Sequence, residues 1–149
     1  MSQVTFQGGA PTGQGSSIVT GLPNQAQPIG VTQDLAIVGT NNELTVGDDI
    51  GTLYVGTDSA TDVSIATLSP GFDGQRLLVQ AITIGGAGVI DFRSDGTGPG
   101  KIIDLRETFH SLDIAFKLST QGDCALLTYS TEGLDTNPPG WYVNQVTNL

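Results

Sequence analysis

Short apolar runs, each ended by glycine, proline or aspartate, are the feature that most constrains the fold of this chain. Residues 112–118 are the clearest case: leucine, isoleucine and phenylalanine occupy every second position, and Asp113, Ala115 and Lys117 lie between them. A period of two is typical of a β-strand with one buried face. No run has the length of an ordinary helix, although residues 105–110 have room for one turn. The sequence therefore predicts an all-β fold.

About nine to eleven short strands at this close spacing are typical of an antiparallel, jelly-roll-like sandwich or barrel. The expected strands cover residues 35–38, 43–46, 52–55, 63–68, 75–84, 89–93, 101–105, 112–118, 124–129 and 141–146. The longest run, residues 75–84, is largely apolar on both faces, which predicts a central strand buried on two sides. Residues 43–46 and 52–55 are each followed by glycine and aspartate, and we expect them to form two adjacent hairpin strands rather than a repeat.

The first 33 residues contain no charged side chain and no histidine. They are rich in glycine, glutamine, serine, threonine and proline, with too few apolar residues and too many breakers to fold alone. We therefore divide the chain into an extended N-terminal arm, residues 1–33, and a body, residues 34–149. Fully extended, such an arm reaches on the order of 110 Å. Its expected contacts with another protein surface or a neighbouring copy are the apolar residues Val4, Phe6, Ile18, Val19, Leu22 and Ile29.

The formal net charge of −10 falls entirely on the body. It argues against binding nucleic acid or an anionic membrane by charge, because those surfaces are also negative. No segment reads as a secretion signal or a membrane span, and the single cysteine, Cys124, excludes an intrachain disulfide. We expect the chain to be made in a cytoplasm and to remain soluble.

A search for catalytic residues predicts that the protein is not an enzyme. His110 and Cys124 match no familiar nucleophile–base spacing, and a cysteine in a strand is more often a small buried hydrophobe. The paired carboxylates at 48/49, 58/62 and 91/95 lie in or beside turns, where aspartate bonds nearby backbone amides. No phosphate loop or EF-hand is present. We expect no catalytic residue, no cofactor and no resident metal, with a cation at acidic turns left open.

Trp141 and Tyr142 form the only adjacent aromatic pair, after a Pro-Pro-Gly turn. Three roles remain open for them: capping the core, forming an intersubunit contact, or binding a sugar. The intersubunit contact is the functional prediction, because tryptophan and tyrosine are enriched in interfaces.

Residues 74–79 (GQRLLV), 112–116 (LDIAF), 122–129 (GDCALLTY) and Trp141 resemble a β-domain common in structural proteins of tailed phages. The resemblance covers residues 73–143, with loose motifs. Two features depart from it: Cys124 at an ordinary strand position, and the long loop 130–140 before the tryptophan. The resemblance implies a homotrimer that acts either as a capsid decoration (cement) protein or as a tail-fibre domain.

The small size, the single body and the uncharged arm favour the decoration class. In that case homotrimers bind the major capsid protein on the outer surface of a virion, and the arms reach onto the shell or a neighbouring trimer. The alternative is a tail-fibre or receptor-binding knob that recognises a host surface glycan near Trp141 and Tyr142. Neither function involves nucleic acid or membrane.

Overall fold

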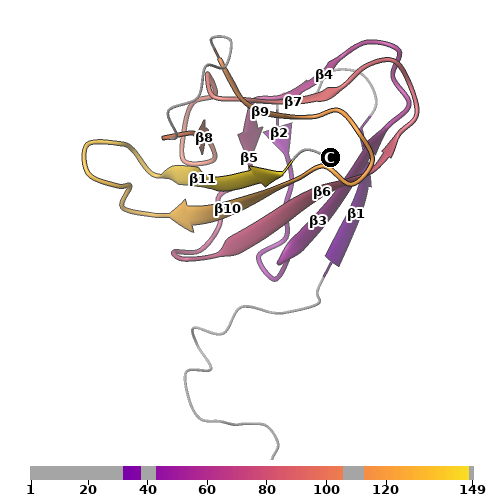
Figure 1. Cartoon of the computed structure of the whole chain (residues 1–149). Helices are drawn as coiled ribbons and strands as arrows, with labels where there is room; N and C mark the ends of the chain where they lie inside the picture. The colour runs from indigo at the N-terminus through magenta and orange to yellow at the C-terminus, as the bar shows by residue number, and fades with distance from the viewer. Residues whose placement is uncertain (1–31, 38–42, 106–112, 148–149) are drawn as a thin grey trace, which may run out of the picture.

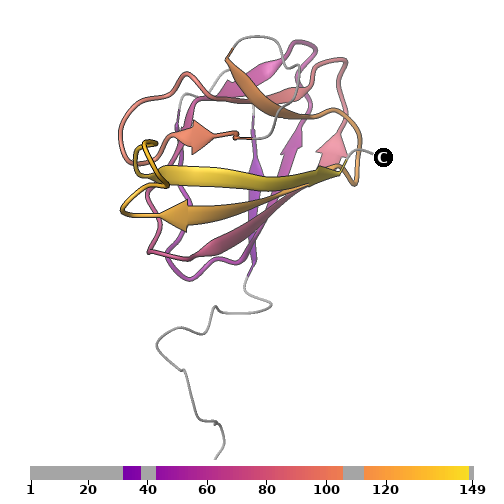
Figure 2. The same ribbon diagram turned by 60° about the vertical axis from the view of Figure 1, so that its left-hand side comes forward.

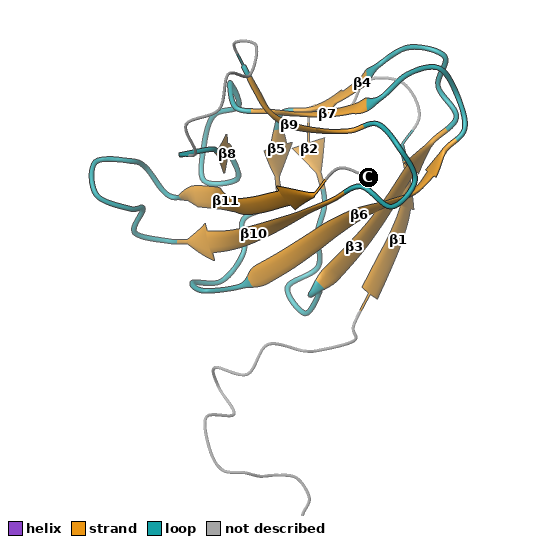
Figure 3. Cartoon of the chain, viewed as in Figure 1, coloured by secondary structure: helices purple, strands orange, loops and turns teal. Residues whose placement is uncertain are grey.

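The computed structural model describes residues 32–37, 43–105 and 113–147. This part of the chain is entirely β-structure and turns, with no helix (Figure 3), so the all-β prediction is confirmed. The strands are β1 (Thr32–Ala36), β2 (Glu43–Leu44), β3 (Thr52–Thr57), β4 (Val63–Ile65), β5 (Thr67–Leu68), β6 (Arg76–Ile84), β7 (Ile90–Arg93), β8 (Ile102–Ile103), β9 (Ile114–Leu118), β10 (Cys124–Ser130) and β11 (Gly140–Thr147).

The strands form two main layers (Figures 1 and 2). One layer is a six-stranded sheet in the order β1-β3-β6-β10-β11-β8, and the other is a three-stranded sheet in the order β4-β7-β9. A short two-stranded sheet, β2-β5, lies beside them. The apolar faces of these sheets turn toward one another and enclose a single buried cluster, which is the arrangement of a β-sandwich.

The first half of the body winds as a coil. After β1 the chain leaves the six-stranded sheet and forms β2. It returns to the sheet as β3, leaves again to form β4 and β5, and returns once more as β6. Each return runs in the same direction, so β1, β3 and β6 are parallel neighbours, with Thr32 beside Thr52 and Thr52 beside Leu78. The crossing strands also pair in parallel, β2 with β5 and β4 with β7.

This coil corrects two sequence predictions. Five of the eight strand pairs among the described residues are parallel, four of them in this half, so the expected antiparallel pairing is wrong there, and the jelly-roll-like topology stays a prediction. The strands β2 and β3 are not a hairpin, because β2 pairs with β5 while β3 lies between β1 and β6. A turn residue ends a strand without specifying its next partner, and a return through the opposite layer produces parallel neighbours.

The second half closes the coil with antiparallel pairs. Strand β10 pairs with β6 on one side and with β11 on the other, and β7 pairs with β9. The two-residue strand β8 ends the large sheet beside β11, with both of its side chains buried. This edge of the sheet is therefore short and covered.

Aromatic side chains fill the space between the layers. Phe92 and Phe116, paired across β7 and β9, stack with ring centroids 4.5 Å apart. Tyr129 and Trp141 meet edge to face at 5.2 Å. Offset-stacked and edge-to-face contacts of this kind add to the free energy gained by burying the rings. The buried residues of β9 include Phe116 and Leu118, as the alternation in the sequence predicts, but also Ala115, which the alternation placed on the other face.

Strand β6 is central in its sheet but buried on one face only, which corrects the expectation of a strand buried on two sides. Leu77, Val79 and Ala81 are buried in the core, whereas Ile82 is 40% exposed. Leu78 is partly exposed on the same outer face. No second layer among the described residues covers this face, so apolar side chains on both sides of a strand did not indicate a buried sheet.

The residues that carry the phage-domain resemblance have structural roles here. The Gln75 side chain is buried, donates to the Ile50 carbonyl oxygen at 3.0 Å and accepts from the Phe72 amide at 3.2 Å. The buried Asp123 carboxylate accepts the backbone amides of Ser119 and Thr120, both at 2.9 Å. These side chains fix the turns before β6 and β10 by satisfying buried donors and acceptors.

We expect Gly71→Ala to destabilise the body by about 1–3 kcal/mol, the usual cost of overpacking. An added Cβ at this position would lie 2.5 Å from Oε1 of Gln75 and 2.9 Å from Cζ2 of Trp141. Urea unfolding followed by tryptophan fluorescence measures the change. Phe72→Ala, at the neighbouring and 41% exposed position, should cost less; an equal cost at both positions would contradict this account of the loop.

Candidate functional site

Within residues 32–37, 43–105 and 113–147, β1 is the open edge of the large sheet. Among the described residues β1 pairs only with β3. The Ile37 amide donates to the Gly56 carbonyl oxygen at 2.7 Å, which fixes the phase of the parallel ladder. In that phase the odd-numbered residues of β1 direct their N–H and C=O groups toward β3. The backbone groups of Thr32, Asp34 and Ala36 therefore point away from the sheet.

Gln33 fastens this edge strand to the body. Its Nε2 donates to the Thr45 carbonyl oxygen at 2.9 Å, and its Oε1 accepts from the Gly47 amide at 3.2 Å. Thr32 and Gln33, which the sequence analysis placed at the end of the arm, thus lie in strand β1 and contact the body. The uncharged segment thus leads directly into the open edge.

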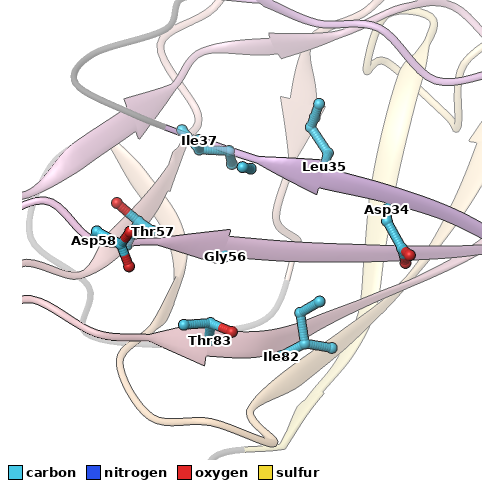
Figure 4. A pocket seen from close by; sticks show the side chains of 9 residues that line it. Asp34, Leu35, Ile37, Gly56, Thr57, Asp58, Ile82 and Thr83 are labelled. Atoms are coloured by element: carbon cyan, nitrogen blue, oxygen red, sulfur yellow. The ribbon is translucent and has the colours of Figure 1, made fainter.

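A groove lies at the end of this edge, on β1, β3 and β6 (Figure 4). One row across the sheet consists of Ala36, Gly56 and Thr83, which are paired in register. Because alanine and glycine have almost no side chain, the row forms a hollow. The groove encloses about 320 Å³, and Ile82, which is 40% exposed, lines it with an apolar side chain.

Gly56 and a β-bulge shape the hollow together. The register of β3 against β6 shifts between Val55 and Gly56, so that Ile82 is the extra residue on β6. An added Cβ at Gly56 would lie 3.2 Å from both the Cβ and the carbonyl oxygen of Thr83. Bulges and strand glycines commonly mark a close approach of another chain or a ligand. The sequence analysis took Gly56 as the turn residue that follows a strand, whereas in the structure it lies inside β3.

Two carboxylates, from Asp34 and Asp58, lie along the groove, and no basic residue lines it. In Figure 4, Asp34 and Leu35 point to opposite sides of β1. The groove is therefore apolar at its floor and acidic along part of its wall. An uncharged, extended segment fits these conditions better than an acidic one.

The aromatic pair near the C-terminus lies inside the body. Trp141 is 0% exposed and its Nε1–H donates to the Ser69 carbonyl oxygen at 3.0 Å. Tyr142 is almost fully buried, and its hydroxyl donates to the Pro138 carbonyl oxygen at 2.6 Å. Neither ring has a free face for a second subunit or a sugar, so this placement favours the core-capping role over the predicted intersubunit contact.

The other candidates of the sequence analysis do not assemble into a chemical site. Val4, Phe6, Ile18, Val19, Leu22, Ile29 and His110 lie outside the described residues. Within the described part of the chain, no three histidine, cysteine or acidic side chains come close enough to hold a metal ion. Asp95 forms an ion pair with Arg93 at 2.7 Å, and Asp62 accepts the Val89 amide, so these carboxylates have structural partners.

Asp91 is an acid in an unusual position. It lies on β7, is 7% exposed, and its Oδ1 is 3.6 Å from Nζ of Lys117 on β9. That separation makes an ion pair without a hydrogen bond, and Oδ1 has no hydrogen-bond partner among the described residues. Burial raises the pKa of Asp91 above its ordinary value; the Lys117 ammonium opposes the rise, and the nearby Asp62 carboxylate adds to it.

Comparison of the sequence with models of known protein families and with curated proteins finds no match. No helix in the described part of the chain has the length and apolar character needed to cross a membrane. The open edge and its groove are therefore the feature on which a functional hypothesis rests.

Asp91→Asn should change the dependence of stability on pH. As the pH rises from the ordinary carboxyl value through the raised pKa of Asp91, the unfolded state loses its proton first, so the wild-type protein loses stability. The asparagine variant lacks this loss, and its stability relative to wild type should increase across that interval and then level off. Urea unfolding at a series of pH values measures the free energy of unfolding of both proteins.

Lys117→Met is the matched variant for this test. It removes the charge that opposes the rise in the Asp91 pKa, so the loss of stability with increasing pH should be larger than in wild type. Parallel pH profiles for all three proteins would show that Asp91 contributes no pH dependence.

Proposed function

We propose that this chain is a structural attachment protein, specifically a decoration (cement) protein of a viral capsid. In this proposal it binds the major capsid protein as a homotrimer on the outer surface of the virion, after synthesis in the host cytoplasm. Residues 1–31 form an extended arm that grips the shell or a neighbouring trimer. The protein works by binding and multivalency, not by catalysis.

One observation carries the proposal: the uncharged segment enters the body at its open sheet edge. An exposed edge strand offers unpaired N–H and C=O groups, and natural monomers usually protect such edges with charge, proline or a covering loop. Here the described residues leave β1 uncovered, with Asp34 as its only charged side chain. An uncharged arm that contains apolar residues, together with an open sheet edge, fits a protein that associates with other subunits.

The strongly acidic body supports the same proposal. All 15 acidic and all five basic residues lie after residue 33. A crowded layer of such bodies repels itself laterally and stays soluble, whereas the uncharged arm brings no unpaired charge into a buried contact. Three arms per trimer multiply weak contacts through effective concentration.

The tail-fibre alternative rests on a glycan patch at Trp141 and Tyr142. Both side chains are buried, so the geometry offers no observation in its favour. Location in an intact particle separates the two functions: a copy number in the hundreds supports decoration, and a few copies at a tail contradict it.

Deletion of residues 1–31 should leave a folded body that decorates shells at least about tenfold more weakly, because the multivalent contacts are lost. The deletion ends before Thr32 so that β1 and the Gln33 hydrogen bonds remain. Co-sedimentation with undecorated shells measures occupancy, and a cooperative thermal transition shows that the body is folded.

A variant with residues 1–31 replaced by a glycine-serine segment of equal length is the control for the length of the arm. It should bind as weakly as the deletion. Decoration at wild-type occupancy by either protein would refute the role of the arm.

A further inference from the structure

We infer that the free edge of β1, with the hollow beside Ala36 and Gly56, accepts an extended segment from residues 1–31 of a second copy of this chain. The inference rests on the proposed function, since it names the partner of the open edge. It adds that this body receives an arm as well as supplying one, which the capsid-binding proposal does not require.

The backbone of β1 supplies the first part of the argument. Thr32, Asp34 and Ala36 each point an N–H and a C=O away from β3, because the ladder uses the alternate residues. A strand laid along this edge would form hydrogen bonds with all three. Strand addition of this kind takes its affinity from main-chain bonds and its specificity from pockets for alternate side chains.

The hollow supplies the pocket. A strand added beside β1 would place one of its outward side chains next to Ala36, above the low row that continues through Gly56 to Thr83. Ile82, 40% exposed, offers that side chain an apolar contact. Residues 3–7 and 17–20 of the chain provide short apolar-containing stretches for this purpose, with Val4 and Phe6 two positions apart and thus on one face of a strand.

Charge selects the occupant among the segments of this chain. Asp34 and Asp58 line the groove without a basic residue. Like charges brought together are unfavourable, so an acidic segment is disfavoured here. The uncharged stretches of the body, residues 77–90 and 136–149, lie largely in β6 and β11 and are already paired in the sheet. Residues 1–31 are the longest stretch that carries no acid and no base.

A second copy fits better than the same chain folding back on itself. The stretch directly before β1 contains Pro23 and Pro28, which cannot donate to a sheet ladder. The strand-like stretches lie further away, so the same chain would have to close a loop of eleven residues (21–31) or more. A copy held nearby in an assembly delivers them without that reversal.

Ala36→Lys tests the inference in the full-length protein. Lysine is a natural protector of sheet edges, and the Ala36 side chain is exposed, so the body should fold. Sedimentation equilibrium should give a mass of several 15.4 kDa chains for wild type and a smaller mass for the variant, because the association through β1 is lost. Gln145→Lys, an exposed position on β11 of the same sheet, is the control and should keep the wild-type mass.

Ala36→Pro is the second variant, because it removes only the N–H that points away from β3, and it should behave as Ala36→Lys does. A mixing experiment then separates exchange between copies from other contacts. Full-length Ala36→Lys can supply an arm but not receive one, whereas a tagged chain lacking residues 1–31 can only receive one. Capture of the first protein by the second, at about one to one, supports the inference.

A monomeric wild type, unchanged association of both Ala36 variants, or no capture in the mixture would overturn the inference. Capsid binding is measured separately. If the mixture forms complexes but the wild-type protein does not bind shells, the proposed function fails while arm exchange stands. If wild type binds shells but the mixture forms no complex, arm exchange alone is rejected.

Discussion

Backbone hydrogen bonding in a coil of parallel strands is the constraint on which the rest of this structure depends. Each strand that returns to the large sheet pairs with the strand of the previous turn, so β3 pairs with β1 and β6 pairs with β3. Buried backbone groups must be paired, and the coil meets this requirement turn by turn. The first strand has no earlier partner, and so an open edge is a direct result of the winding.

The opposite edge of the large sheet has a different structure. There the chain changes to antiparallel pairing through β6, β10 and β11, and the sheet ends at the short, buried strand β8. The two edges of one sheet thus differ in length and cover. Hydrogen bonds between backbone groups and the side chains of Gln75 and Trp141, which donate, and Asp123, which accepts, hold the turns that make this change. These buried polar contacts, rather than a chemical site, explain why such residues stand where they do.

The sequence predicted the all-β class and the positions of most strands, because period-two patterns and turn residues act locally. It did not predict the parallel pairing, since a run such as residues 43–46 carries no information about whether its partner is next along the chain or one turn of the coil away. The exposed outer face of β6 was also misjudged: Leu78 and Ile82 are apolar, yet no layer among the described residues covers them. For the site, the uncharged segment was visible in the sequence, but the hollow needed the register that places Ala36 beside Gly56.

The Gln33 side chain and the β1 ladder also determine how the body would respond to mechanical load. A pull on the first residues, directed along β1, would act parallel to the strand and stress the hydrogen bonds to β3 in shear, so that they resist together rather than opening one at a time. The two bonds of Gln33 to Thr45 and Gly47 lie at the start of this strand and would share the load first. A pull along β1 would therefore meet more resistance than a pull across the strand.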